Sequence, residues 1–110
     1  MPTLKDKKCI PCEGDVKPLS KTAAQRIVGE LTGWTLAADG KSLSKEMVFK
    51  DFDKAMDFVN MVADAAEFEQ HHPDIDIRYN KVLLGLSTHS IGGLSENDFI
   101  LAAKIDDIRL

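Results

Sequence analysis

Residues 75–88 have the sequence IDIRYNKVLLGLST, which predicts two strands joined by a tight turn. Apolar and charged residues alternate in the first half, in the order Ile75, Asp76, Ile77, Arg78 and Tyr79. This period of two is typical of a strand with one buried face. Asn80-Lys81 is expected to form the turn and Val82–Thr88 the returning strand. Strands joined by so short a turn pair antiparallel, and their apolar face must be covered by other elements.

A second hairpin is expected earlier in the chain. The segment Trp34–Ala38 is apolar and β-prone, and Asp39-Gly40 is a turn dipeptide. Leu43–Phe49 is then the returning strand. A helix should precede this hairpin, beginning at Ser20, whose hydroxyl can cap the first turn, and ending at Gly33.

Two more helices are expected after the first hairpin. Asp51 can cap a helix that must end before Pro73, because the residue preceding a proline is pushed out of the α region. Ser95 and Asp98 have the spacing of a capping box, which opens a helix through about Ile108. The order α-β-β-α-β-β-α predicts a single α+β domain with an antiparallel sheet.

The composition is that of an ordinary globular domain, with 44% hydrophobic and 29% charged residues in a chain of 110. The net charge of −4 provides no basic field for nucleic acid or anionic lipid. No apolar run approaches the length of a membrane span. Because of the charge and the short apolar runs together, neither nucleic acid nor a membrane is an expected partner. The amino terminus lacks the apolar core of a secretory signal, and the cytoplasm is the expected compartment.

Residues 1–18 are expected to form an irregular amino-terminal arm, and residues 19–110 the domain. The arm contains residues that interrupt regular structure: Pro2, Pro11, Gly14 and Pro18. Cys9 and Cys12 are too few for a disulfide scaffold and are expected to be free thiols. Because the arm has no periodic apolar face, we expect catalysis not to depend on it.

All three histidines lie close together in the sequence, as His71, His72 and His89. The first two follow the second helix and the third ends the last strand, so these element ends can meet at one rim of the sheet. Several imidazoles there could both give and take protons near neutral pH. Taken singly, each histidine is more often structural, facing solvent, capping a helix or bonding a carbonyl.

Two carboxylates could assist the histidines. Glu67 lies four residues before His71, so the two share a helix face if the last turn is regular, and the carboxylate could orient the ring. An ordinary surface pair also explains that spacing. Asp98 is well explained as a helix cap.

The combined pattern resembles the signature of the pterin-4a-carbinolamine dehydratases. The positions that carry the resemblance are Glu67, His71, His72, Pro73, Tyr79, His89 and Asp98. The neighbouring stretches YNKV, LSTH and GLSE are similar to the family's strand-turn-strand and helix entry, and Trp34 stands where the family has a tryptophan. The resemblance covers roughly residues 19–108.

The resemblance implies a four-stranded antiparallel sheet with three helices packed on one face. It implies dehydration of 4a-hydroxytetrahydrobiopterin to quinonoid dihydropterin in tetrahydrobiopterin recycling, with no metal or organic cofactor. His71 and His89 would be the main acid–base residues, Glu67 would hold the working tautomer of His71, and His72 would bind the pterin. The other implied substrate contacts are Gln70, Pro73, Ser87, Thr88, Ser90, Trp34 and Asp98.

The same resemblance implies partners. Family members associate through sheet edges and helices, so a homodimer or homotetramer is expected, with a functional link to an aromatic amino-acid hydroxylase. Gln70 and Ser90 stand where the vertebrate form has acids, which bears on substrate preference.

Two other functions remain open from the sequence. A vertebrate family member stabilises dimers of a transcription factor, so a non-catalytic pterin-binding or dimerisation role is the alternative. A metal enzyme is the other, but adjacent histidines rarely ligate one ion and no second cysteine pair completes a zinc site.

Overall fold

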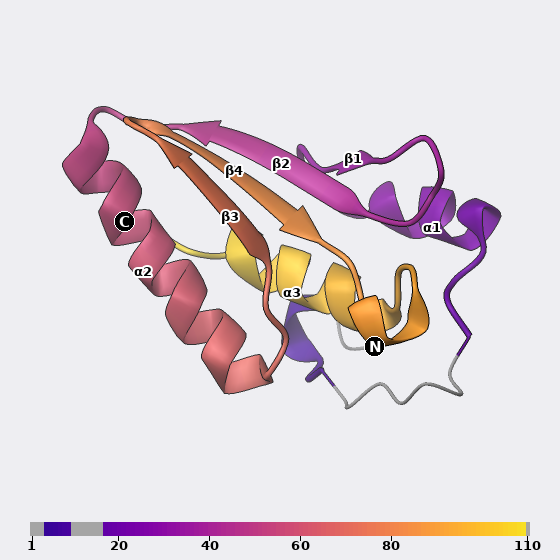
Figure 1. Ribbon diagram of the computed structural model, residues 1–110. Coiled ribbons are helices and arrows are strands. Elements are labelled where there is room, and N and C mark those ends of the chain that lie inside the picture. The colour runs from indigo at the N-terminus through magenta and orange to yellow at the C-terminus, as the bar shows by residue number, and fades with distance from the viewer. Residues whose placement is uncertain (1–3, 10–16, 110) are drawn as a thin grey trace.

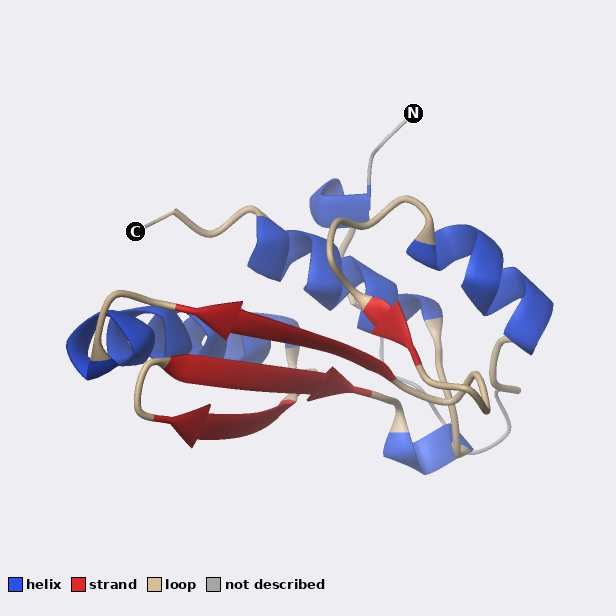
Figure 2. Ribbon diagram, turned by 90° about the horizontal axis from the view of Figure 1, so that it is seen from above, coloured by secondary structure: helices blue, strands red, loops and turns tan. Residues whose placement is uncertain are grey.

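A four-stranded antiparallel sheet with the order β1-β2-β4-β3 has the three α-helices on one side (Figures 1 and 2). The structure is a computed structural model, and it describes residues 4–9 and 17–109. In chain order the elements are η1 Leu4–Asp6, α1 Lys21–Val28, β1 Thr35–Leu36, β2 Leu43–Val48, α2 Phe52–Glu69, β3 Asp74–Arg78, β4 Lys81–Leu86, η2 His89–Ile91 and α3 Glu96–Asp106. The predicted α+β class and element order are confirmed.

The core lies between the sheet and the helices. β4 is central, and its alternate residues Val82, Leu84 and Leu86 are buried, as a period of two requires. Side chains from every layer complete the core: Leu43, Phe58, Val62, Leu94, Phe99 and Ile105.

Each α-helix begins at the predicted cap. The Ser20 hydroxyl accepts a hydrogen bond from the Ala23 N–H (3.1 Å), and an Asp51 carboxylate oxygen accepts one from the Lys54 N–H (2.9 Å). At α3 the capping box of Ser95 with Asp98 is present. These bonds satisfy backbone donors that the first helical turn leaves unpaired.

Several predicted boundaries are wrong. α1 ends at Val28 with Gly29 as its cap, and Gly33 lies in the following loop with φ of 81°. β1 has only two residues, Thr35 and Leu36. A loop-forming glycine can mark a turn after a helix as well as its end, so the sequence signal is ambiguous.

The second hairpin turn is also displaced from its prediction. Arg78 pairs with Lys81, so the turn residues are Tyr79 and Asn80, and Tyr79 has the left-handed φ of 54°. β4 ends at Leu86, two residues before the predicted end. The Asn80 side chain donates to the Phe49 carbonyl (2.9 Å), which fastens this turn to the end of the first hairpin.

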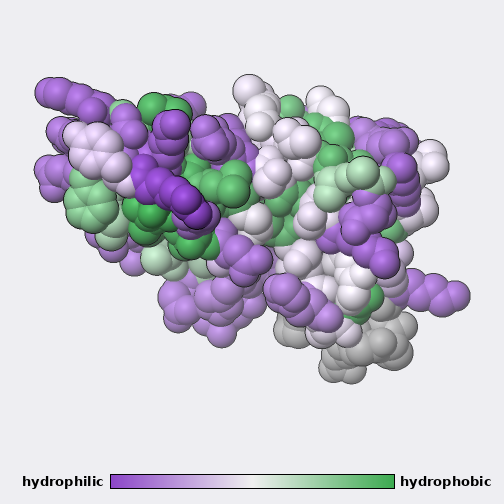
Figure 3. Space-filling view, turned by 45° about the horizontal axis from the view of Figure 1, so that its top comes forward, coloured by the Kyte–Doolittle hydropathy of each residue, from purple (hydrophilic) through white to green (hydrophobic). Residues whose placement is uncertain are grey.

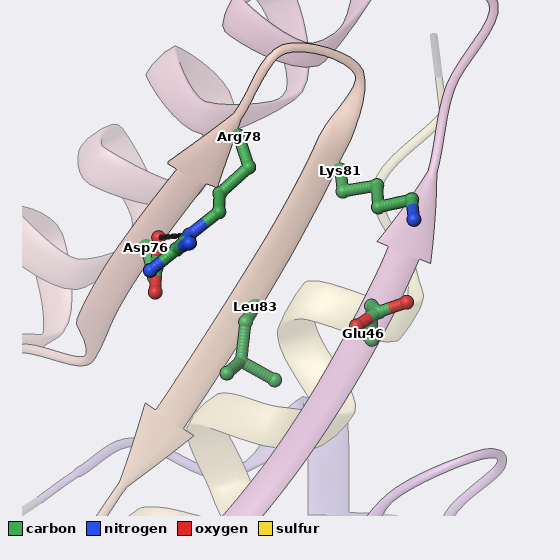
Figure 4. Close-up of a pocket in the computed structure, with 5 residues that line it drawn as sticks. All are labelled: Glu46, Asp76, Arg78, Lys81 and Leu83. Carbon is green, nitrogen blue, oxygen red and sulfur yellow. Dashed lines mark hydrogen bonds and ion pairs between the residues drawn. The ribbon is translucent and has the colours of Figure 1, made fainter.

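No helix of the described residues covers the sheet face opposite the core. This face carries apolar side chains between polar ones (Figure 3), and it contains a shallow hollow of about 280 Å³. The hollow is lined by Glu46, Asp76, Arg78, Lys81 and Leu83, with Arg78 Nε 3.3 Å from Asp76 Oδ1 (Figure 4). None of the three histidines lines it. Among the residues that the structure describes, no helix has the length and apolar content needed to cross a membrane.

Candidate active site

The end of α2 sets the direction of the adjacent histidines. Gln70 takes a left-handed conformation (φ 55°, ψ 39°) directly after the last helical residue, Glu69. The His71 N–H then donates back to the Ala66 carbonyl (3.1 Å). This is the usual reversal by which a left-handed residue closes a helix. His71 therefore lies outside the helix, and the regular i,i+4 geometry expected with Glu67 is absent.

His71 pairs with Asp98. Its Nε2 lies 2.6 Å from Asp98 Oδ1, and the His71 side chain is only 12% exposed while Asp98 is fully buried. Because a carboxylate can only accept, the Nε2 proton points at Asp98 and Nδ1 is the nitrogen left for chemistry. The carboxylate in contact with His71 is therefore Asp98, and not Glu67 as the resemblance implied.

The second oxygen of Asp98 is also fully used. Asp98 Oδ2 accepts from the Thr88 hydroxyl (2.8 Å) and from the Ser95 N–H (3.0 Å), and the Thr88 and Ser95 hydroxyls lie 2.8 Å apart. A buried carboxylate is tolerated when donors of this kind surround it. Thr88 and Asp98, which the resemblance implied as substrate contacts, are therefore both buried, and both belong to the hydrogen-bond network of the Asp98 carboxylate.

Glu67 pairs with His72 in place of His71. Glu67 Oε1 lies 2.6 Å from His72 Nε2, and the two side chains are 71% and 57% exposed. The predicted Glu67–His71 contact is wrong because Gln70 turns the chain between them. Gln70 is itself exposed, and Pro73 is half-buried where the chain enters β3.

His89 lies on a short loop anchored to the same carboxylate. Thr88 pairs with Gly93 across this loop, its N–H donating to the Gly93 carbonyl (2.8 Å). His89 opens η2 and is exposed, as is Ser90, while Ser87 is half-buried. Since Thr88 binds Asp98 from one side and His71 binds it from the other, Asp98 joins the two histidine-bearing segments.

Trp34 does not belong to this cluster. It is 7% exposed in the core, and its indole N–H donates to Asp106 Oδ1 (3.0 Å), which also lies 2.8 Å from Lys45 Nζ. Asp106 is eight residues beyond Asp98, about 12 Å further along the helix. The implied pterin contact of Trp34 is not supported by this placement.

The sequence did not indicate two contacts in this region. Ser95 was visible as a cap, but nothing local indicated that its acidic partner also reaches His71. Glu69, the last residue of α2, carried no local signal for its contact with Cys9. Cys12 lies outside the described residues. Within residues 4–9 and 17–109 no three His, Cys, Asp or Glu side chains are grouped as a metal ion would require.

The arrangement can transfer protons. It presents one imidazole held by a buried carboxylate, a second imidazole on a neighbouring loop and a third paired with an exposed carboxylate. Such groups suit general acid–base catalysis.

Comparisons with known proteins identify the same family that the sequence pattern resembles. The model of the family described as Pterin 4 alpha carbinolamine dehydratase matches residues 17–108. A Nitrosospira multiformis protein, named provisionally as a pterin-4-alpha-carbinolamine dehydratase, is 49% identical over 105 residues, 96% of this chain and 91% of that protein. The mitochondrial pterin-4-alpha-carbinolamine dehydratase 2 of Arabidopsis thaliana is 43% identical over 111 residues, 97% of this chain and 59% of that protein.

The fold is also similar to that of solved structures. The crystal structure of a transcriptional coactivator/pterin dehydratase from Brucella melitensis matches with a TM-score of 0.77 at 31% identity. The match covers 82% of this chain and 96% of that one.

Proposed function

The chain belongs to the pterin-4a-carbinolamine dehydratase family, and on that premise we propose that it converts 4a-hydroxytetrahydrobiopterin to quinonoid dihydropterin and water by histidine acid–base catalysis. As a family member it is a dehydratase, a hydro-lyase that acts on a pterin. The observation that carries the proposed mechanism is the pairing of His71 with the buried Asp98.

The reaction requires two proton transfers and no oxidant. The C4a–O bond breaks as the departing hydroxyl gains a proton and leaves as water. The N5–H proton is removed, and its electron pair forms the C4a–N5 double bond. The pterin ring thus loses the elements of water without a change in redox state.

In this mechanism protonated His71 is the acid. It gives its Nδ1 proton to the departing hydroxyl while Nε2–H stays bonded to Asp98, which stabilises the charged ring before transfer and fixes its orientation. His89, on the loop that Thr88 fastens to Asp98, accepts the N5 proton. Solvent then restores both protonation states. Positioned groups of this kind contribute about 10²–10⁴-fold each.

His72 and Glu67 bind and orient the substrate in this proposal. Their pair is exposed, so it can rearrange around a ligand at little energetic cost. His72→Ala should mainly raise KM, with a smaller fall in kcat. The exposed polar groups of Gln70 and Ser90, together with the half-buried Ser87, are the further proposed contacts with the pterin edge.

Assembly into a homodimer or homotetramer is part of the proposal. β1 pairs only with Leu43 and Ser44, so within the described residues no strand covers the outer edge of β2 beyond them. An edge of this kind is available for pairing with a second copy. A functional link to an aromatic amino-acid hydroxylase follows from the proposed substrate. Light scattering that reports a monomer at micromolar concentration would argue against the assembly.

The decisive experiment is a dehydration assay on enzymatically generated 4a-hydroxytetrahydrobiopterin, with and without a metal chelator. We expect acceleration that survives chelation. A rate equal to the uncatalysed one would refute the proposed function, and a loss in chelator that zinc restores would refute the metal-free mechanism.

A further inference from the structure

Residues 4–9, which we call the amino-terminal strap, pack along α3 (Figure 1). Leu4 contacts the core, and Lys104 Nζ donates to the Lys5 carbonyl (2.9 Å) near the end of α3. Lys7 Nζ lies 3.3 Å from Glu96 at the beginning of α3. The arm that the sequence presented as irregular therefore includes a segment, with one turn of 3-10 helix, attached along the length of α3.

The end of the strap also reaches α2. The Cys9 N–H donates to Glu69 Oε1 (2.8 Å), and the Cys9 thiol donates to the Asn97 carbonyl (3.5 Å). Lys8 Nζ lies 5.4 Å from the centre of the Phe68 ring. Cys9 thus binds the last residue of α2 and the second residue of α3 at once.

The thiol remains a donor at neutral pH. Burial, followed by the charge and the hydrogen bonding of Glu69, raises the pKa of Cys9 from 9.0 to about 12. A protonated thiol beside a carbonyl oxygen is a hydrogen-bond donor, whereas a thiolate there would be repelled.

Glu69 is the charged centre of this junction. It is 7% exposed, its Oε1 accepts from Cys9, and its Oε2 lies 3.7 Å from Lys104 Nζ. A buried carboxylate destabilises the fold unless it has hydrogen-bond or charged partners. Glu69 finds these partners only while the strap, α2 and α3 stay packed together.

The junction flanks the proposed acid–base pair. Glu69 is two residues before His71, and Asn97 is one residue before Asp98. The strap therefore contacts both helices next to His71 and Asp98, whose Nε2 and Oδ1 atoms lie 2.6 Å apart.

We propose that Cys9 and Glu69 are positioning residues, which hold the last turn of α2 against the first turn of α3 and so keep His71 on Asp98. The effect on rate rests on the proposed function, whereas the effect on the His71–Asp98 contact does not. The expectation that the arm is dispensable for catalysis is replaced by this proposal.

The test uses three variants of the full chain: deletion of residues 2–9, Glu69→Ala and Glu69→Gln. We expect the deletion and Glu69→Ala to lower kcat about tenfold, with KM changed less than about twofold, because small misplacements of a catalytic group are costly. Glu69→Gln keeps an oxygen that can accept from Cys9, and it should retain most of the rate. The second readout is the His71 ring N–H proton in ¹⁵N-histidine NMR spectra, assigned with His72→Gln and His89→Gln.

We expect this ring proton to be protected from exchange in the wild type and in Glu69→Gln, and to exchange rapidly in the deletion and in Glu69→Ala. The matched control is Lys5→Ala with Lys7→Ala, which removes two exposed ion pairs but keeps the strap, and it should match the wild type in both readouts. All rates are measured where unfolding curves show each variant folded, and Glu69→Ala decides the matter if the deleted chain does not fold.

A protected His71 proton in both the deletion and Glu69→Ala would overturn the proposal, whatever their rates. An unchanged kcat in both variants would overturn the claim that Cys9 and Glu69 affect the rate by positioning His71. If the wild type itself fails to dehydrate the pterin, the proposed function falls, and the NMR comparison still decides whether the strap positions His71.

Discussion

Asp98→Asn changes one buried atom of the proposed site and nearly preserves its shape. In the wild type the carboxylate accepts from three donors: the His71 ring, the Thr88 hydroxyl and the Ser95 N–H. An asparagine has one acceptor oxygen and one NH₂ donor. If the oxygen keeps the donors on the Oδ2 side, the NH₂ faces Nε2 of His71. A histidine that accepts this hydrogen bond at Nε2 is neutral, with its proton on Nδ1. The protonated ring that the proposed mechanism requires would instead have its Nε2–H facing the NH₂ group, without a carboxylate to stabilise it.

The magnitudes follow from the contacts. Asp98→Asn loses one hydrogen bond to a charged group, so the free energy of unfolding should fall by about 1.5–3 kcal/mol. Asp98→Ala would strand three donors at about 1–3 kcal/mol each, which approaches the whole stability of a small domain. The asparagine variant is therefore the usable one. Its kcat should fall about 10²–10⁴-fold, because the acid loses its counter-charge and its orientation.

Glu67→Gln is the matched control, because it makes the same chemical change in an exposed carboxylate that also lies 2.6 Å from a histidine. Its unfolding free energy should change by less than about 1 kcal/mol. Urea titrations give the stabilities, and the dehydration assay gives kcat and KM. A folded Asp98→Asn protein with wild-type kcat, or a loss no larger than that of Glu67→Gln, would refute the assigned role.

Further outcomes are expected elsewhere in the chain. His71→Ala and His89→Ala should each lower kcat about 10²-fold or more, and the double variant should lose less than the product of the two single effects. Near wild-type turnover in both folded single variants would show that these residues have structural roles. Trp34→Phe removes a core hydrogen bond, so it should destabilise by about 1 kcal/mol and leave kcat unchanged, whereas a large rise in KM would place the indole at the pterin. In a Cys12→Ser background, Cys9 should react with iodoacetamide at pH 8 about 10³-fold more slowly in the folded than in the unfolded chain, because the raised pKa lowers the fraction of reactive thiolate. Equal rates in the two states would contradict the raised pKa. Because the unfolded chain releases this thiol proton first, the Cys9 contribution should lower stability as pH rises from 9.0 towards about 12.

Features that depend on residues close together in the chain could be predicted from the sequence. The three caps at Ser20, Asp51 and Ser95 lie where the residue patterns predicted them, because an N-terminal cap is a bond between residues a few positions apart. The two hairpins were likewise visible, and in the second one so was the period of two along residues 75–79, since the paired strands are neighbours in the sequence. Boundaries were less secure, as Gly33 illustrates, because one residue type serves several kinds of turn.

The pairing of His71 with its carboxylate depends on long-range packing. Spacing favoured Glu67 for His71, but the left-handed Gln70 breaks the helical register just before the histidine. The packing of α2 against α3 then brings His71 to a carboxylate 27 residues away that local sequence presented as a cap. The strap contact between Cys9 and Glu69 spans 60 residues and left no local pattern. Contacts of this kind depend on how the apolar faces of distant elements pack on one another. A buried carboxylate is stable only where that packing also brings hydrogen-bond donors to it, because burial without such partners is costly.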